Sequence, residues 1–206
     1  MKVSKPWRLI RLATISALFL LAMAFFCPVL SRSQINVPST IGAWSGDSPW
    51  PTVGVHLIVL GDGRALTWGG DIPSPGETAF PTYVVTIPSG STNTSSVQSF
   101  IINDDIFCSG DTIMPDGRVF VSGGGDEPAP DAGSGRATTD IFDPSTNTWS
   151  SGPTMSGRRW YPSATVLPSG DILNLLGSID MNFVPNETPD VTTSNGSAIR
   201  SLTGVS

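Results

Sequence analysis

Basic residues are scarce once the first 33 residues are set aside. From Gln34 to Ser206 the sequence has no lysine, six arginines and 17 acidic residues, a net charge of −11. Such an excess of negative charge repels phosphate backbones, which argues against nucleic-acid binding. Charged residues of all kinds make up only 14% of the chain, whereas Gly (22) and Pro (18) supply nearly one position in five. That density of turn formers argues against a helical bundle and predicts many short strands joined by tight turns.

Cysteine and histidine are nearly absent as well. The chain has two cysteines, Cys27 and Cys108, and one histidine, His56. Cys27 lies in an N-terminal segment that has four basic residues before residue 12, an apolar run and then Ser31-Arg32-Ser33. This order predicts a signal peptide over residues 1–33, with an uncleaved membrane anchor as the alternative. Export would place the protein outside the cell, in the cell wall or in the periplasm, and would leave Cys108 unable to close an internal disulfide.

Three segments of the remaining chain resemble one another, and each centres on a turn glycine. These glycines are spaced 54 and 53 residues apart: Gly63, Gly117 and Gly170. Each copy has an apolar strand, a turn of the type Asp-Gly or Ser-Gly, and a second strand, as expected for a β-hairpin. The second strand of the first two copies ends in consecutive glycines, which permit close approach of two backbones.

Further strands are expected at Tyr83–Ile87 and Asp140–Phe142, and Trp149 follows the second of them. Four short strands in about fifty residues, with paired glycines and a late tryptophan, are typical of kelch blades in a β-propeller. We therefore expect an all-β chain with a lead-in at 34–52 and about three four-stranded blades at 53–206. A closed propeller needs at least four blades, so these would form part of an incomplete propeller of the seven-bladed type. The alternative is a β-sandwich with accidental internal similarity.

The third copy departs from the pattern. Asn174 is expected to interrupt its second strand, and the polar segment from Asn182 to Ser206 has a weak strand pattern. The tryptophans, among them Trp68 and Trp149, are expected to anchor the packing of the blades.

Two residues with possible chemistry occupy equivalent repeat positions. Cys108 lies six residues before Met114, and Tyr161 lies six residues before Leu167, where Met114 and Leu167 immediately precede the hairpin turns. Equivalent positions of adjacent blades have the same height around the propeller axis. Cys108 and Tyr161 should therefore start neighbouring inner strands at one end of the central channel, where propeller sites gather.

The motifs around these two residues resemble a known enzyme family. Asp-Ile-Phe-Cys-Ser-Gly at 105–110, followed by Arg-Trp-Tyr-Pro at 159–162, resembles the copper radical oxidases, and within them the glyoxal oxidases more than the galactose oxidases. The resemblance covers about residues 42–180. It implies a thioether between Cys108 and Tyr161, with Tyr161 as copper ligand and radical site. It also implies oxidation of small aldehydes or primary alcohols by O2, which yields H2O2.

The resemblance also implies copper ligands that these residues do not supply. The family uses an axial tyrosine and two histidines from far downstream, and His56 does not match a family ligand. The expectation is a partial oxidase that binds no stable copper and is inactive alone. A non-catalytic secreted kelch module that binds protein or carbohydrate is the alternative, with Cys108 and Tyr161 as a buried thiol and a channel-lining phenol. Arg158 and Arg159 are expected to pair with blade carboxylates, and Trp160 to face away from Tyr161.

Overall fold

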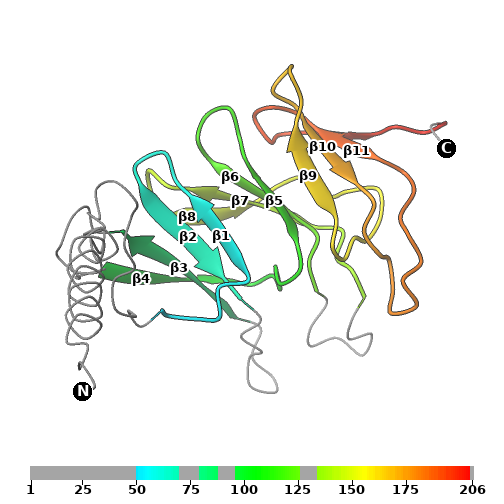
Figure 1. The fold of residues 1–206 in the computed structure, drawn as a ribbon. Coiled ribbons are helices and arrows are strands. Elements are labelled where there is room, and N and C mark those ends of the chain that lie inside the picture. Colours follow the sequence, from blue (N-terminus) through cyan, green and yellow to red (C-terminus); the bar gives the residue numbers. More distant parts are fainter. Residues whose placement is uncertain (1–49, 70–78, 88–95, 126–133, 205–206) are drawn as a thin grey trace, which may run out of the picture. The chain divides into compact units, whose positions relative to one another are not determined.

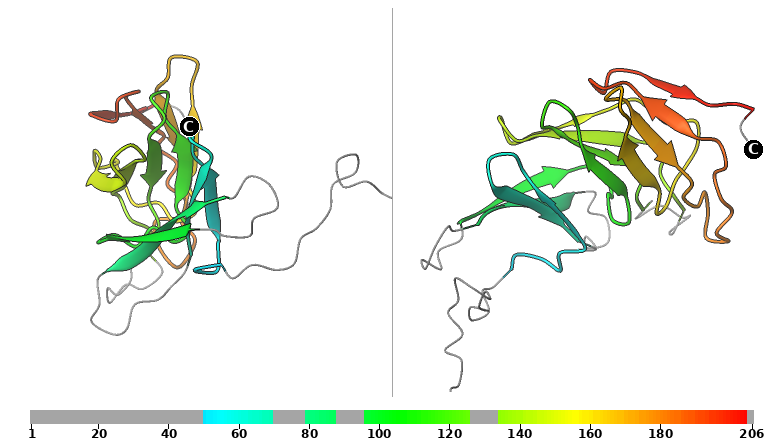
Figure 2. Two further views of the ribbon diagram at one scale, coloured as in Figure 1. Left: turned by 90° about the vertical axis from the view of Figure 1, so that its left-hand side faces the viewer. Right: turned by 45° about the horizontal axis from the view of Figure 1, so that its top comes forward.

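The structure, a computed structural model, describes residues 50–69, 79–87, 96–125 and 134–204. All of them belong to one compact unit, Ser48–Ser206. The described residues form twelve strands and no helix, arranged as three four-stranded antiparallel sheets that follow one another along the chain (Figures 1 and 2). No helix that could cross a membrane is therefore found among them. The predicted signal peptide and nearly all of the lead-in lie outside the described residues.

The strands of each sheet keep their chain order from the innermost to the outermost. The first sheet contains β1 (His56–Val59), β2 (Arg64–Trp68), β3 (Phe80–Thr86) and β4 (Ser96–Ile102). The second contains β5 (Gly110–Ile113), β6 (Val119–Ser122), β7 (Thr139–Asp143) and β8 (Thr148–Ser151). The third contains β9 (Ser163–Val166), β10 (Ile172–Leu175), β11 (Asp190–Thr192) and β12 (Ile199–Ser201). The prediction of an all-β chain with kelch-type blades is confirmed.

The three inner hairpins have the same turn. Gly63, Gly117 and Gly170 have φ of 85°, 88° and 86°, a region that L-residues with a Cβ rarely adopt. Each glycine N–H donates to the carbonyl three residues earlier, at 2.8–2.9 Å, and the next residue closes the loop. This is a type I turn followed by a glycine bulge, the common three-residue hairpin loop. The repeat alignment made from sequence is therefore correct at its turns.

The third sheet corrects two expectations. Asn174 does not interrupt β10: its side chain is fully buried and donates to Thr192 Oγ1 at 3.2 Å, so the amide pairs across β10 and β11. The polar C-terminal segment also supplies two strands, β11 and β12. A polar residue is compatible with a strand interior when a neighbouring strand offers it a hydrogen bond. The third blade thus has the same four-stranded order as the first two.

Apolar side chains fill the space between consecutive blades. Trp68, Leu66, Val84 and Phe142 are members of the cluster that joins the first two blades. A smaller cluster of Met114, Phe120, Ile141 and Ile172 joins the second and third. Two tryptophans also bond between the first two blades, because Trp68 Nε1 donates to Ile106 O at 3.0 Å and Trp149 Nε1 donates to Thr82 Oγ1 at 2.9 Å.

The arginine after each Asp-Gly turn forms hydrogen bonds with the following blade. Arg64 donates to Asn147 Oδ1 (2.7 Å) and Pro144 O (2.6 Å) in the outer turn of the second blade. Arg118 donates to Asn195 O (2.8 Å) in the outer turn of the third. The repeated Asp-Gly-Arg sequence therefore fixes the turn and the spacing between blades at this end of the strands.

Candidate functional site

Cys108 and Tyr161 lie at equivalent places in the second and third blades. Each stands two residues before an inner strand, β5 or β9. Their backbones share an unusual conformation, with φ of 60° at Cys108 and 58° at Tyr161. Non-glycine residues rarely adopt this left-handed region, and residues held in it cluster at functional sites. The Tyr161 N–H donates to Cys108 O at 2.8 Å, so the segments that lead into the two blades are joined directly.

Glycines allow these two lead-in segments to approach so closely. A Cβ on Gly110 would lie 2.7 Å from Pro162 O. Gly123 and Gly124 follow β6 and have φ of 67° and 118°. A Cβ on Gly123 would overlap with the carbonyl oxygen of Arg159, and one on Gly124 would overlap with that of Asp105. The paired glycines thus bring the segment before Cys108 and the segment before Tyr161 against the end of β6.

The side chains of Cys108 and Tyr161 also interact. Cys108 is buried, with 3% of its surface exposed, whereas Tyr161 is 58% exposed. A hydrogen bond with Cys108 is the main cause that raises the pKa of the Tyr161 phenol, and partial burial adds to it. Burial raises the pKa of the Cys108 thiol, and the contacts with the Tyr161 and Trp160 side chains offset part of that rise. Both directions indicate that the Tyr161 phenol and the Cys108 thiol lie near each other.

Aromatic rings extend this pair. The Trp160 ring lies 4.9 Å from the Tyr161 ring between centroids, and its other neighbour, Phe183, stacks on it at 5.9 Å and 14°. The expectation that Trp160 faces away from Tyr161 is therefore wrong. Alternation of side chains holds along a regular strand, but β9 begins only at Ser163 and the positive φ of Tyr161 turns its side chain back towards Trp160.

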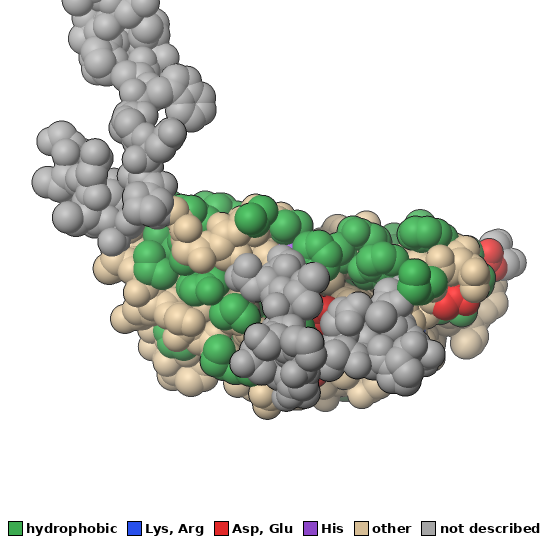
Figure 3. Space-filling view, turned by 90° about the horizontal axis from the view of Figure 1, so that it is seen from below, with side chains coloured by type: hydrophobic (Ala, Val, Ile, Leu, Met, Phe, Trp, Pro, Cys, Tyr) green, Lys and Arg blue, Asp and Glu red, His purple; other side chains and the backbone are tan. Residues whose placement is uncertain are grey.

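The surroundings of this aromatic group are apolar and open. Exposed hydrophobic side chains follow in the connection from β10 to β11: Leu176, Met181, Phe183 and Val184. Figure 3 views the face on which β5 and β9 begin, and hydrophobic side chains are spread over its uncovered part with no Lys or Arg visible. The exposed hydrophobic side chains that follow β10 therefore suit a neutral molecule better than a strongly charged one.

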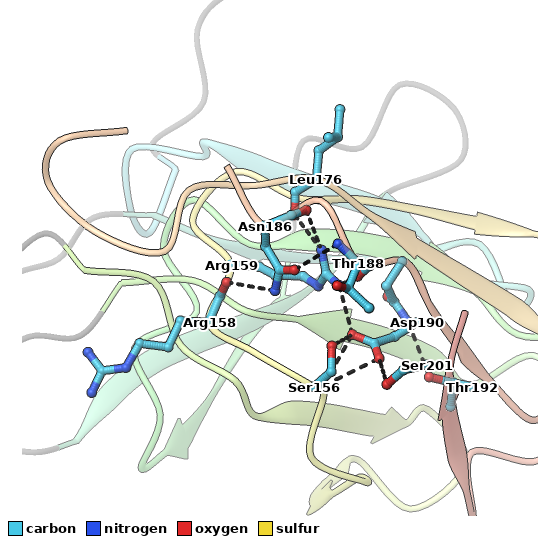
Figure 4. A network of polar contacts seen from close by, with 10 residues as sticks. Ser156, Arg158, Arg159, Leu176, Asn186, Thr188, Asp190, Thr192 and Ser201 are labelled. Carbon is cyan, nitrogen blue, oxygen red and sulfur yellow. Dashed lines mark hydrogen bonds and ion pairs between the residues drawn. The ribbon is translucent and has the colours of Figure 1, made fainter. Parts of the chain in front are cut away.

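The two arginines before Trp160 differ: Arg159 is part of a buried polar network, whereas Arg158 is exposed. Arg159 is completely buried and forms an ion pair with Asp190, also completely buried, at 2.7 Å. Figure 4 shows the Arg159 guanidinium among the carbonyls of Leu176, Asn186 and Thr188, with Asp190 at its end. The expected carboxylate partner of Arg159 is confirmed. Arg158 donates to the Ser134 hydroxyl at 2.7 Å.

His56 belongs to the packing between the first two blades. Its Nδ1 lies 2.9 Å from Asp111 Oδ2, and its ring stacks on Trp68 at 4.8 Å and 7°. Among the described residues no group of three His, Cys, Asp or Glu side chains could hold a metal ion. The Tyr161 phenol fits one ligand position of a copper ion, and the adjacent thiol fits a thioether, but this part of the chain does not supply a full ligand set.

A large cleft lies at the other end of the strands. It has about 460 Å³ and lies between the hairpin turns of the first two blades and the outer turn of the second, with Asp62, Asp116 and Asp143 among its lining residues. Cys108 and Tyr161 precede β5 and β9, whereas these turns follow β1 and β5. The cleft is therefore separate from the candidate site.

Comparison with known proteins agrees with the repeat architecture. Residues 114–156 match the Kelch motif. The described part of the chain is therefore made of kelch-type propeller blades. No curated protein matches the chain.

One solved structure has a fold similar to that of this chain. The chain is similar to a structure titled "Novel fungal alcohol oxidase with catalytic diversity among the AA5 family, in complex with copper", with a TM-score of 0.60 and 21% identity. The match covers 79% of this chain and 33% of the fungal one, so the chain spans about a third of that oxidase. The kelch-type blades of this chain therefore have a fold similar to that of part of this copper-bound fungal oxidase.

Sequence reasoning missed part of the site. It did not include Phe183, which reaches Trp160 from the β10–β11 connection, or Asp190, the partner of Arg159. No repeat pattern marks either residue, because both positions depend on the path of an irregular connection. The only available signal was a group of three apolar residues, Met181, Phe183 and Val184, in a polar segment.

Proposed function

We propose that this chain is the Cys–Tyr-bearing part of an extracellular copper radical oxidase of the glyoxal or galactose oxidase type. The observation that carries the proposal is the direct interaction of Cys108 and Tyr161 from equivalent blade positions, both with left-handed backbones. Similarity to the fungal alcohol oxidase supports the proposal. The substrate would be a small aldehyde or primary alcohol, with O2 as the oxidant and H2O2 as the second product.

The pair would mature by forming a carbon–sulfur bond. The Cys108 sulfur would bond to a ring carbon of Tyr161 next to its hydroxyl, with loss of the thiol hydrogen and one ring hydrogen. The two electrons released would pass to O2, which becomes H2O2. The main-chain hydrogen bond from Tyr161 N–H to Cys108 O favours this product because it holds the two residues side by side. A thioether lowers the potential of the phenol because the unpaired electron spreads onto sulfur.

Each residue of the site has a separate role in this proposal. Tyr161 would contribute its phenolate to the copper ion, and the bound copper would supply a second one-electron acceptor beside the oxidised phenol. Cys108, which is buried, would lower the oxidation potential of the Tyr161 phenol through the thioether. Trp160 covers part of the Tyr161 ring, and Phe183 packs against Trp160. The remaining copper ligands are not assigned to any described residue.

Peptide mapping of the natural protein tests the proposal. The protein would be isolated from the medium of its own host grown with copper, digested and analysed by mass spectrometry. We expect one linked peptide that contains Cys108 and Tyr161 and has lost two hydrogens. Protein from copper-starved cultures is the control and should give separate peptides, with Cys108 open to alkylation after unfolding.

Separate peptides from copper-replete material would contradict the oxidase proposal and favour a kelch module that binds protein or carbohydrate. We also expect no peroxide from the purified 206-residue chain supplied with copper and methylglyoxal, because one phenolate and one thioether leave most coordination positions of copper unfilled. Steady peroxide release would show that the chain supplies more ligands than we assign.

A further inference from the structure

Arg159 connects two parts of the site. Its backbone belongs to the segment that carries Tyr161, and the main chain is bonded to the second blade: its N–H donates to Arg136 O at 2.9 Å, and its carbonyl accepts from Gly124 N at 3.1 Å. Its guanidinium points the other way, into the β10–β11 connection, where it donates to Leu176 O at 2.7 Å. One residue therefore ties the Tyr161 segment to the connection that carries Phe183.

Asp190 binds the Arg159 guanidinium and is itself bonded to two further segments. Its Oδ2 accepts from Arg159 at 2.7 Å and from the Ser156 hydroxyl at 2.9 Å, while its Oδ1 accepts from the Ser201 hydroxyl at 2.8 Å (Figure 4). The carboxylate is thus held by β12 and by the segment before Arg159. A fully buried ion pair contributes little net stability because removing both charges from water is costly. Its attested use is to select one register among several.

The pair is linked to Tyr161 through the main chain. Arg159 is neutralised by Asp190, and the groups that act on the Tyr161 phenol include Cys108 but not Arg159. Tyr161 is two residues from Arg159, and the residue between them, Trp160, exchanges two backbone hydrogen bonds of 2.7 Å with Ser178. Ser178 lies in the same connection that the guanidinium holds.

We propose that the buried Arg159–Asp190 pair is a positioning device that sets Tyr161 in its left-handed conformation and holds it against Cys108. This rests on the proposed function in so far as the pair serves thioether formation. Arg159 contacts neither the thiol of Cys108 nor the phenol, so it is a positioning residue. Its guanidinium holds the connection, the connection holds Trp160 through Ser178 and Phe183, and Trp160 sets the start of Tyr161.

Nuclear magnetic resonance of the 206-residue chain tests this directly. Replacing Cys27 with Ser and Tyr83 with Phe leaves one cysteine and one tyrosine, because the chain has two of each. Selective labelling then reports the nuclear Overhauser effect between the Cys108 β-protons and the Tyr161 ring. We expect it in the parent and expect its loss in Arg159→Lys, because a lysine keeps the charge but cannot bond to Asp190 and several carbonyls together.

Arg118→Lys is the matched control. This change weakens the hydrogen bond from Arg118 to Asn195 O, which joins the same two blades at the opposite end of the strands. It should lower the melting temperature but keep the nuclear Overhauser effect between Cys108 and Tyr161. If Arg159→Lys does not fold, the double variant Ser156→Ala and Ser201→Ala loosens Asp190 while both charges stay, and it should weaken the effect. A folded Arg159→Lys or double variant with an undiminished effect, or equal loss in Arg118→Lys, would overturn the proposal. None of these readouts needs copper, so they stand apart from the test of the proposed function.

Discussion

Asp140 should make the fold less stable as the pH rises. It lies in β7 with 4% of its surface exposed, next to Asp104 and Arg136, which form an ion pair with each other. Burial is the main cause that raises the pKa of Asp140 from 3.8 to about 7, and the negative charge of Asp104 adds to it. The Arg136 guanidinium acts in the opposite direction but does not compensate. Asp140 is therefore protonated in the native state at pH values where the unfolded chain has released that proton.

The sign and size of the effect follow from this difference. Between pH 3.8 and about 7 the native state binds more protons than the unfolded state, so the free energy of unfolding falls as the pH rises. A difference of about three pKa units corresponds to about 4 kcal/mol in total, of which roughly 2–3 kcal/mol is lost between about pH 5 and pH 8. Asp140→Asn removes the ionisable group and keeps the shape of the protonated acid, so it should gain stability over the wild type as the pH rises.

Urea unfolding at several pH values measures this. The quantity of interest is the difference in the free energy of unfolding between Asp140→Asn and the wild type, because other titrating groups cancel in it. Asp143→Asn is the matched control on the same strand: hydrogen bonds from Ser145 lower the pKa of Asp143, so its titration lies outside this range. If the Asp140→Asn difference were as constant with pH as that of Asp143→Asn, the assignment of a buried proton to Asp140 would be refuted.

Two further predictions concern packing. Gly123→Ala should destabilise the fold by more than about 2 kcal/mol, because a Cβ there overlaps with Arg159 O at φ of 67°, whereas Gly117→Ala, with similar φ and open space, should cost about 1 kcal/mol. Equal losses for the two in urea unfolding would show that the contact with Arg159 is unimportant. Phe142→Ala should cost about 3–5 kcal/mol because the ring is completely buried, and Phe183→Ala, 67% exposed, should cost less than about 1 kcal/mol. A loss below about 1 kcal/mol for Phe142→Ala would contradict the placement of the interblade core.

The regular part of the fold was predictable from the sequence. Turn chemistry is local, since Gly63, Gly117 and Gly170 need only their own neighbours to adopt positive φ. Spacing then aligned Cys108 with Tyr161, and the structure places both two residues before an inner strand. The prediction for Asn174 was wrong because it considered only the neighbouring residues in the sequence. The sequence predicts that Asn174 breaks a strand, and only the position of Thr192 on β11 shows how its amide nitrogen is bonded.

The blade type, the three hairpins and the equivalence of Cys108 and Tyr161 can be predicted from the sequence, because each depends on the order of residues within a repeat. Tertiary structure decided how the site is completed. The positive φ of Tyr161 turns its ring onto Trp160, and Phe183 packs on Trp160 from an irregular connection. Arg159 binds Asp190, which lies thirty-one residues later in the chain. These contacts have no sequence period, because they form only where the segment that leads into one blade meets the connection between two other strands.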